Sequence, residues 1–464
     1  MSVLICDALP GQGKTTACIN LMNSDPKGKY IFVTQYLSEV DRIKSSCNGR
    51  EFYTPEATYR THFRKIDSVW ELILSGKNIA TTHALFESYT PEIKQAIKDW
   101  GYTLILDEVI DVMSISRLAQ DDVEILKRGN AIQEGDDGFM HWELEDYDPY
   151  GIFREEMLKA KSKNFICYMD KYFYWSIPAD LFTCFKNVYV LTYLFSGQPL
   201  RSFFEISHIQ YSFIGVECVN GAYRFCDHKP DGRAIDLSGL IHILESHTAN
   251  SIGDERGALS YSWYGRAYAE EGQPKLDRLK KNLRNVMCNT FRVRDGLSMW
   301  TTFKQYASIM RGKGYWNGFV TYNKRACNNF ANRRYLAYLV NNFPRPWELQ
   351  YYKDRGASMC PDVYALCILI QWMFRSAIRN GEEIWLYVPS KRMRDLLKLW
   401  IVELAKGRDV ELALNLAKAS EMSRNEQRKE LNTIKKELVP MKKLEDLRGI
   451  AHSMSKKKRG GAKR

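Results

Sequence analysis

Short apolar runs alternate with segments of helical spacing along the first half of the chain. Continuous apolar runs predict buried strands over residues 2–9, 30–36, 78–86, 102–112 and 187–195. Apolar residues three or four positions apart predict helices over residues 14–23, 37–47 and 91–100. This alternation indicates an α/β fold with a doubly wound parallel sheet.

A second series of the same kind follows in the next two hundred or so residues. Its apolar pattern predicts strands over residues 315–322 and 382–389, and helices over residues 331–343, 364–381 and 391–405. We therefore expect a first domain at residues 1–204 and a second α/β domain at residues 205–405. Residues 406–464 have a charged helical pattern that leads into a basic, flexible tail.

The composition is that of an ordinary globular protein. Of the 464 residues, 45% are apolar, which is enough for a large core, and no run approaches the roughly 18 apolar residues of a membrane span. The 11 Cys residues include no C-x-x-C pair, which argues against a zinc site and a disulfide framework. Free thiols favour a reducing compartment, so we expect a cytoplasmic protein without a membrane partner.

The net charge of +12 is concentrated near the C-terminal end. Residues 401–464 contain 17 Lys and Arg against 9 Asp and Glu, and the last ten residues contain six basic and no acidic side chains. Contacts of Lys and Arg with phosphates dominate non-specific affinity for nucleic acids. The tail therefore either binds a polyanion or is a solvated, disordered segment.

A glycine-rich segment joins the first predicted strand to the first helix. ALPGQGKT begins at Ala8 and matches the phosphate-loop pattern G-x-x-x-x-G-K-[ST], with Ala8 at the first Gly position. The open N–H groups of a helix N-terminus bind phosphate, and Gly residues let the loop close around it. We predict a nucleotide site whose residues are Gly11, Gln12, Gly13, Lys14, Thr15 and Thr16. Lys14 would reach the β- and γ-phosphates, and the alternative is a chance match in a structural loop.

Two carboxylates stand at the end of the strand expected over residues 102–112. Ionised Asp107 and Glu108 are costly beside an apolar run unless a cation or hydrogen-bond donors neutralise them. In a phosphate-loop protein that cation is Mg²⁺, so we predict that Asp107 and Thr15 hold the metal. Glu108 would orient and deprotonate the attacking water, which favours hydrolysis of a nucleoside triphosphate. The alternative is a capping turn after the strand.

Three polar residues recur in the apolar helix expected over residues 364–381. Gln371, Arg375 and Arg379 are spaced four residues apart, which would place them on one helix face. Arginines on an apolar helix need anionic partners, and a γ-phosphate is such a partner, so both are candidate arginine fingers. An exposed basic stripe or an internal salt bridge is the alternative.

In their order, these segments resemble the motifs of superfamily 2 helicases, and more closely the helicase-like ATPases of tailed phages. Besides the loop and LILDEV, the resemblance over about residues 2–405 rests on VTQYLSEVDRI (33–43), ATTHALF (80–86), VLTYLFSGQ (190–198), FVTYNKRACNNFANRRYLAYLVN (319–341) and QWMFRSAIR (371–379). In the last motif Phe374 replaces the usual Gly and the final Arg comes one residue late. The comparison therefore favours Arg375 over Arg379 as the finger.

The resemblance implies two tandem RecA-like domains that hold ATP and Mg²⁺ between them. Lys14 would lie on one side of the nucleotide and Arg375 on the other. Single-stranded or forked DNA would lie across both domains, contacted by Thr34, Thr82 and His83 at strand ends. Thr34 could equally cap a helix and His83 could be a core histidine. The aromatic stretch over residues 260–268 suits either base stacking or core packing.

The sequence thus predicts an ATP-dependent DNA helicase or single-stranded DNA translocase that acts in phage DNA replication or related DNA processing. A terminase-like packaging motor is one alternative, although residues 401–464 are too short and too basic for its usual nuclease domain. An ATP-switched nucleic-acid-binding loader is another, which Glu108 argues against. DNA and replication proteins are the expected partners, and the host cytoplasm is the expected location.

Overall fold

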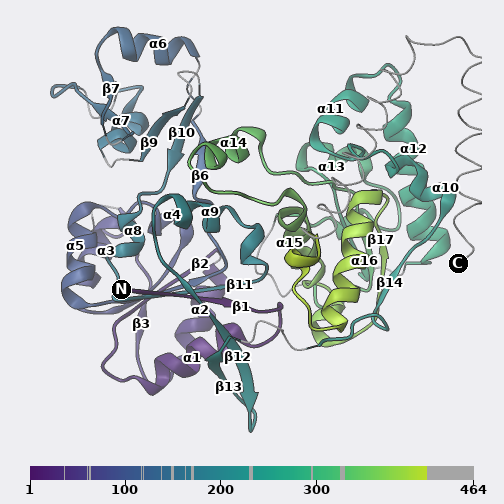
Figure 1. Cartoon of the computed structure of the whole chain (residues 1–464), viewed down its shortest axis with the longest axis horizontal. Helices are drawn as coiled ribbons and strands as arrows, with labels where there is room; N and C mark the ends of the chain where they lie inside the picture. The colour runs from purple at the N-terminus through teal and green to yellow at the C-terminus, as the bar shows by residue number, and fades with distance from the viewer. Residues whose placement is uncertain are drawn as a thin grey trace, which may run out of the picture. The chain divides into compact units, whose positions relative to one another are not determined.

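The apolar runs of the first half of the chain build one large sheet. In the computed structural model, the described residues form eight strands in the order β13-β12-β1-β11-β5-β2-β4-β3. All neighbouring strands are parallel except β12 and β13, which form an antiparallel hairpin. The strands are β1 (Ser2–Asp7), β2 (Tyr30–Thr34), β3 (Phe52–Tyr53), β4 (Asn78–Thr82), β5 (Thr103–Asp107), β11 (Asn187–Thr192), β12 (Ser212–Val219) and β13 (Ala222–Asp227). The expected parallel sheet of an α/β fold is confirmed (Figure 1).

The structure describes most of the chain up to residue 414. The described residues are 1–35, 37–59, 61, 64–116, 118, 120–136, 138–147, 151–161, 164–168, 172–228, 234–293, 296–323 and 330–414. Met1–Arg408 form one compact unit and Asp409–Arg464 form a second. The predicted basic tail therefore lies outside the described residues. No helix among the described residues combines the length and the apolar character needed to cross a membrane.

Helices cover both faces of the first sheet because its strands are apolar on both sides. Along β2, Phe32 packs into a core with α1 (Lys14–Ser24) and α2 (Leu37–Ser46). Ile31 and Val33 face the opposite core, since successive side chains of a strand point to opposite faces. That core is covered by α3 (Lys65–Leu74), α4 (His83–Phe86), α5 (Pro91–Trp100), α8 (Asp180–Thr183) and α9 (Pro199–Ile206).

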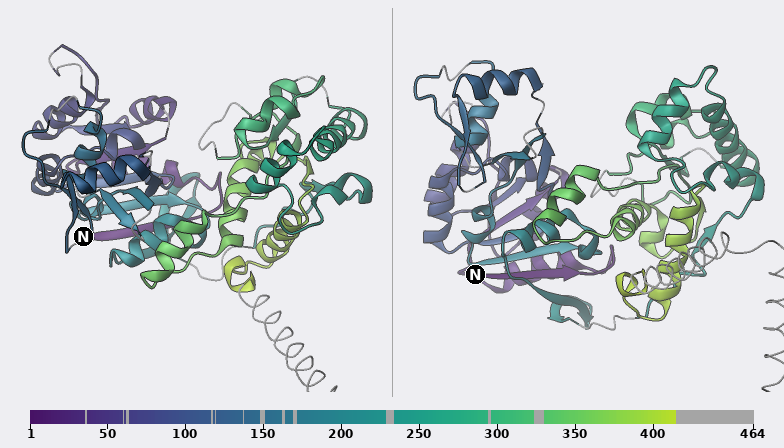
Figure 2. Two further views of the ribbon diagram at one scale, coloured as in Figure 1. Left: turned by 90° about the horizontal axis from the view of Figure 1, so that it is seen from above. Right: turned by 45° about the horizontal axis from the view of Figure 1, so that its top comes forward.

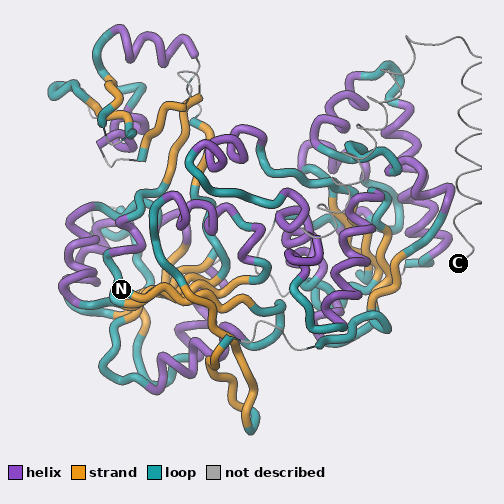
Figure 3. The backbone as a smooth tube through the Cα atoms, viewed as in Figure 1, coloured by secondary structure: helices purple, strands orange, loops and turns teal. Residues whose placement is uncertain are grey.

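An insertion separates β5 from β11, and the sequence patterns did not predict it. It contains an antiparallel sheet in the order β6-β10-β9 and a hairpin of β7 and β8, with a small core of its own. Figure 3 shows these strands apart from the strands of the first sheet. Its elements are β6 (Met113–Ile115), α6 (Gln120–Arg128), β7 (Ile132–Glu134), β8 (Met140–Trp142), α7 (Arg154–Lys161), β9 (Phe165–Tyr168) and β10 (Tyr172–Ser176).

A second parallel sheet follows, in the order β14-β17-β16-β15. Its strands are β14 (Ile241–Ile243), β15 (Ser298–Thr301), β16 (Tyr335–Tyr338) and β17 (Ile384–Tyr387). The larger helices of this half are α11 (Tyr261–Ala269), α12 (Pro274–Asn285), α14 (Pro346–Asp354), α15 (Pro361–Met373) and α16 (Lys391–Ala405). Shorter helical turns are α10 (His247–Asn250), η2 (Ser251–Gly253), η3 (Val286–Thr290), η4 (Lys304–Tyr306), α13 (Ala307–Met310) and η5 (Trp316–Gly318).

Two elements of the second half differ from the sequence prediction. Residues 331–343 were expected to be a helix, but they contain the strand β16, which lies between β15 and β17. A continuous apolar run fits a doubly buried strand as well as a buried helix, so periodicity alone does not separate them. Residues 315–322 were expected to be a strand. They contain the turn η5 instead, and only Phe319 makes an isolated bridge, to Trp300.

The helix expected over residues 364–381 is shorter than predicted. α15 ends at Met373, and Ser376 takes an extended backbone before the short turn η6 (Ala377–Asn380). The Ser376 hydroxyl donates a hydrogen bond to the Met373 carbonyl oxygen at 2.7 Å. Such a local side-chain bond competes with continuation of a helix. The predicted common face of Gln371, Arg375 and Arg379 is therefore wrong.

The first sheet extends beyond the boundary expected at residue 204. That residue lies inside α9, and β12 and β13 continue the sheet as far as Asp227. The turn between them contains Asn220 and Gly221, both with positive φ. Asn-Gly is a strong signal for a two-residue hairpin, so the sequence held the information for these strands. In Figure 2 the hairpin protrudes from the edge of the sheet.

α14 of the second half packs on the insertion sheet. Trp347 stacks on Tyr174 of β10 with 4.1 Å between ring centroids. Beside this contact Glu348 is only 7% exposed. Burial raises the pKa of Glu348 to about 7, Arg345 opposes the rise, and Asp111 adds to it. The docked helix thus holds a carboxyl group that is favoured in its protonated form.

This burial predicts a pH-dependent stability. The folded-state pKa of Glu348 exceeds its ordinary value of 4.5, so the folded chain binds more protons than the unfolded chain between these two values. The free energy of unfolding should therefore fall as pH rises from about 4.5 to 7. Glu348→Gln should unfold like the parent at pH 5 but be about 1–3 kcal/mol more stable at pH 8, since each pKa unit corresponds to about 1.4 kcal/mol.

Denaturant unfolding at pH 5 and pH 8 measures this difference. Glu271→Gln, at an exposed position, is the matched control and should show the same small effect at both pH values. An equal effect of Glu348→Gln at both pH values would contradict the prediction.

Candidate phosphate-loop site

The segment between β1 and α1 forms a closed loop around the Lys14 side chain. Lys14 is 9% exposed, and its ammonium donates to the carbonyl oxygens of Ala8 at 2.5 Å and Leu9 at 3.3 Å. Gly11 and Gly13 have φ of 88° and 83°, in the left-handed region that favours glycine. Gly13 begins α1 without a side-chain cap. The helix N-terminus therefore has the open geometry that binds phosphate.

Ala8 occupies the first position of the loop without strain. Its N–H donates to the carbonyl oxygen of Thr192 on β11 at 3.0 Å, and its methyl group packs against the core on the α1 side. Ala8 is not among the described residues with positive φ. The backbone at this position therefore does not require glycine.

The predicted metal ligands meet across the ends of α1 and β5. The Thr15 hydroxyl donates to Asp107 Oδ1 at 3.2 Å. Burial raises the pKa of Asp107 to about 7; Glu108 and Glu39 add to the rise, while Arg42 and Lys14 oppose it. A half-buried carboxylate with two further carboxylates near it fits a cation. One carboxylate and one hydroxyl are a sparse ligand set, which suits Mg²⁺ because that ion keeps waters and substrate phosphates as ligands.

Glu108 stands just beyond the strand in an unusual conformation. Its φ is 69°, and its N–H donates to the carbonyl oxygen of Leu191 at 3.0 Å. Positive φ at a residue with a side chain is uncommon and costs backbone energy. The strand that was expected over residues 102–112 consequently ends at Asp107. The sharp turn carries the Glu108 carboxylate away from the line of β5.

α15 brings a side chain from the second half of the chain to this carboxylate. Gln371 Nε2 donates to Glu108 Oε2 at 3.2 Å. The distance in sequence is 263 residues, so only the tertiary fold makes the contact. The structure thus brings Gln371 next to Glu108, as it brings Thr15 next to Asp107.

The two candidate arginines have different environments. A Cβ atom on Gly11 would lie 3.8 Å from both Cγ and the carbonyl oxygen of Arg379, so η6 abuts the phosphate loop. Arg379 is exposed, whereas Arg375 is only 4% exposed. Burial raises the pKa of Tyr338 on β16, Tyr322 and Tyr364 add to the rise, and the nearby charge of Arg375 opposes it. Arg375 is therefore buried near Tyr338, while Arg379 lies beside the loop, and the choice of one of them as the finger stays a prediction.

The segment after β11 connects the loop strand to α15 and α16, and most of these contacts were missed from the sequence. Half-buried Asp7 accepts hydrogen bonds from the N–H groups of Leu194 at 2.8 Å and Phe195 at 2.9 Å. Leu194 has a φ of 53°. The polar end of the loop strand β1 therefore holds this turn in place.

The same segment touches the second half at three points. Cys367 Sγ of α15 donates to the Tyr193 carbonyl oxygen at 3.2 Å. Within the segment, Gln198 Nε2 donates to the same oxygen at 2.8 Å. Trp400 Nε1 donates to the Tyr193 hydroxyl at 2.8 Å. A Cβ on Gly197 would lie 2.6 Å from the backbone of Val363, so the two backbones are in close contact. This segment links the end of β1 to the helix that carries Gln371.

The residues predicted to contact nucleic acid lie together at the carboxyl ends of β2 and β4. Thr34 and Thr82 are register partners, and His83 begins α4. Thr34 is 1% exposed, so its hydroxyl lies beneath the surface, whereas Thr82 and His83 are half-buried. In the aromatic stretch over residues 260–268, Trp263 and Tyr264 are buried in α11. Core packing therefore accounts for those two rings.

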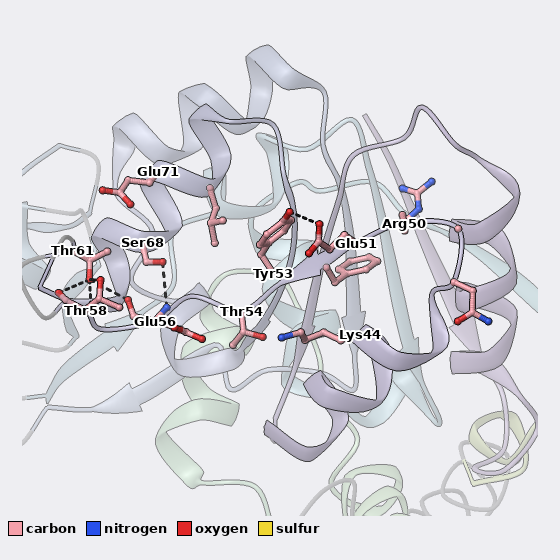
Figure 4. A pocket seen from close by; sticks show the side chains of 14 residues that line it. Lys44, Arg50, Glu51, Tyr53, Thr54, Glu56, Thr58, Thr61, Ser68 and Glu71 are labelled. Carbon is pink, nitrogen blue, oxygen red and sulfur yellow. Dashed lines mark hydrogen bonds between the residues drawn. The ribbon is translucent and has the colours of Figure 1, made fainter.

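A separate pocket of about 780 Å³ lies between α2, β3 and α3 (Figure 4). Its polar groups largely bond to one another or to the backbone. Thr61 donates to the Glu56 carbonyl oxygen at 3.1 Å, and Arg50 donates to the Gly28 carbonyl oxygen at 2.8 Å. None of the predicted site residues lines the pocket.

Comparison with known proteins identifies the family. Residues 235–401 match the model of the YonV C-terminal Rossmann-like domain, which spans the second sheet. The SPbeta prophage-derived uncharacterized protein YonV of Bacillus subtilis (strain 168) is 36% identical over 409 residues, which cover 86% of this chain and 98% of that protein. The chain therefore belongs to the YonV family.

A solved structure is similar at a lower level. Xpd4 of S. tokodaii aligns with 86% of this chain and 93% of its own at 12% sequence identity, with a TM-score of 0.40. A similarity at that level carries no functional argument.

The different burial of the two arginines predicts effects of different size on stability. Arg375→Ala removes a large buried side chain and should lower the free energy of unfolding by about 2–5 kcal/mol. Arg379→Ala changes an exposed residue and should stay within about 0.5 kcal/mol of the parent. Urea unfolding of the two variants measures both values. Equal destabilisation would show that the two positions are not buried to different extents in solution.

Proposed function

We propose that this member of the YonV family is an ATP-dependent DNA helicase or single-stranded DNA translocase that acts in phage DNA replication or related DNA processing. The observation that carries the proposal is the convergence of groups from both halves of the chain on the loop and the acidic pair. Lys14 and the acidic pair belong to the first half, while Gln371 on α15 and Arg379 on η6 belong to the second. The prophage origin of the similar B. subtilis protein supports the phage setting.

In the proposed site, ATP displaces the internal partners of Lys14. The ammonium would exchange the carbonyl oxygens of Ala8 and Leu9 for phosphate oxygens, while the N–H groups at the start of α1 bind the same anion. Thr15 and Asp107 would hold Mg²⁺, which supplies neutralisation of the triphosphate charge. The raised pKa of Asp107 is consistent with a carboxylate that needs such a cation.

Glu108 and Gln371 fit the task of positioning water. The carboxylate of Glu108 would accept a proton from water as that water attacks the γ-phosphorus. Gln371 donates to this carboxylate and so fixes its orientation. Arg379 would place positive charge at the transferred phosphoryl group, where charge accumulates in the transition state.

Hydrolysis can move the second half of the chain because the same helix α15 carries Gln371 and Cys367. Cys367 contacts the segment after β11 through the Tyr193 carbonyl oxygen. Loss of the γ-phosphate would thus alter both the contact of Gln371 with Glu108 and the contact of Cys367 with Tyr193. Repeated opening and closing of two halves that both contact DNA is the proposed basis of movement along it.

The decisive experiment is ATP turnover with and without single-stranded DNA. The full chain should hydrolyse ATP with Mg²⁺, and single-stranded DNA should raise kcat by about tenfold or more. Lys14→Ala and Glu108→Gln should each reduce turnover by roughly 10²-fold or more, since each removes a group that acts in the transition state. Turnover that no nucleic acid stimulates would refute the motor, and normal turnover by Lys14→Ala would refute the site.

The position of Arg379 predicts a finger at this residue. Arg379→Ala should lower kcat by about 10³-fold, the usual effect of losing an arginine finger, with little change in the Kd for ADP. Steady-state kinetics and ADP titration measure the two quantities. Lys304→Ala, an exposed basic residue on η4, is the matched control and should leave both unchanged. A kcat unchanged by Arg379→Ala would assign the finger elsewhere.

A further inference from the structure

An aromatic ring rests directly on the phosphate loop. A Cβ atom on Gly13 would lie 2.2 Å from Cδ1 and 2.3 Å from Cε1 of Tyr223. Real atoms do not approach so closely, so the ring occupies the space that any side chain at position 13 would need. Gly13 therefore has two independent reasons to be glycine, namely its positive φ and the Tyr223 ring.

The β12–β13 hairpin holds Tyr223 in this place from three sides. β12 pairs with β1, the strand that leads into the loop. Asn20 of α1 donates from Nδ2 to the Tyr223 carbonyl oxygen at 2.8 Å. Phe225, two residues along the same face of β13, stacks on Tyr189 of β11 at 5.5 Å. The ring is thus presented by a fixed edge of the sheet.

The order of the strands decides which end of a nucleotide would meet this ring. The carboxylates that would bind Mg²⁺ and activate water lie at the end of β5, which is separated from β1 by β11. The γ-phosphate must point toward them. The nucleoside must leave the loop in another direction, and the hairpin with Tyr223 lies on the opposite side of β1.

We propose that Tyr223 is the aromatic platform against which the nucleoside of the bound nucleotide packs, with the β12–β13 hairpin as the base side of the site. This inference rests on the proposed nucleotide-binding function. Stacking on an aromatic ring is available to every base, because every base has a π-face. The platform therefore selects nucleotides over simple polyphosphates, without choosing one base.

Binding of ADP with Mg²⁺ to the full chain tests the platform, because ADP is not consumed. Tyr223→Ala should raise the Kd for ADP by about tenfold or more, the size expected for losing one stacked base. Tyr223→Phe keeps the ring and should bind within about twofold of the parent. Tyr223→Leu covers Gly13 without a π-face and should bind as weakly as the alanine variant. Tyr268→Ala, an exposed tyrosine on α11, should change nothing.

A fluorescent base gives a readout that is independent of affinity. The diphosphate of 2-aminopurine riboside should lose fluorescence when it binds the parent chain, because stacking quenches the base. At saturation, Tyr223→Ala should leave the bound probe bright. Thermal unfolding of each variant shows that the chain remains folded.

The outcomes separate this inference from the proposed function. If Lys14→Ala abolishes ADP binding but Tyr223→Ala binds normally, the nucleotide site stands and the platform is wrong. The platform is also wrong if Tyr223→Phe binds as weakly as Tyr223→Ala, or if Tyr223→Leu binds like the parent. If the parent chain binds neither ADP nor the probe, the nucleotide site itself is wrong and the platform falls with it.

Discussion

A half-buried carboxylate at the end of β5 is the constraint on which the site depends. Asp107 follows four fully buried residues, and its ionised form is disfavoured there unless positive charge or donors face it. The Thr15 hydroxyl donates a hydrogen bond to it, and the charges of Arg42 on α2 and, less strongly, of Lys14 favour its ionised form. Groups from the strand, the loop and two helices therefore meet at this one carboxylate.

The second half of the chain is tied to that arrangement through short polar contacts. Gln371 reaches Glu108, and Cys367 reaches the segment after β11, one helical turn earlier on α15. Gly197 permits the approach because a side chain there would meet the α15 backbone. These hydrogen bonds add to an apolar contact between the two halves, where α14 packs on the insertion sheet and Trp347 stacks on Tyr174.

Five strands of the first sheet and the phosphate loop were readable from the sequence because their signals are local, whereas the insertion and the β12–β13 hairpin were not predicted. The apolar runs gave the parallel strands, and the spacing of Lys14 from the glycines gave the loop. The second half was less readable because its run around β16 is apolar on both faces, and because one hydroxyl, that of Ser376, ends α15 early. Because α15 ends at Met373, Arg375 and Arg379 do not share a helix face, and the spacing of apolar residues does not predict this end. The contact of the Tyr223 ring with Gly13 could not be predicted from the sequence, because a contact between residues about 210 positions apart leaves no local pattern, although Asn220-Gly221 marked the hairpin itself.

The residue type at each of three loop positions is explained by its backbone conformation and by the atoms from elsewhere in the chain that surround it. The methyl group of Ala8 packs against the apolar core on the α1 side, and the φ of Ala8 is not positive, so this position does not require glycine. Gly11 faces Arg379 at ordinary contact distance, so its positive φ, and not lack of space, demands glycine. Gly13 is demanded by both conformation and the ring of Tyr223. The departure from the usual pattern at Ala8 thus falls at the one position of the three where neither reason applies, which is why it leaves the loop intact.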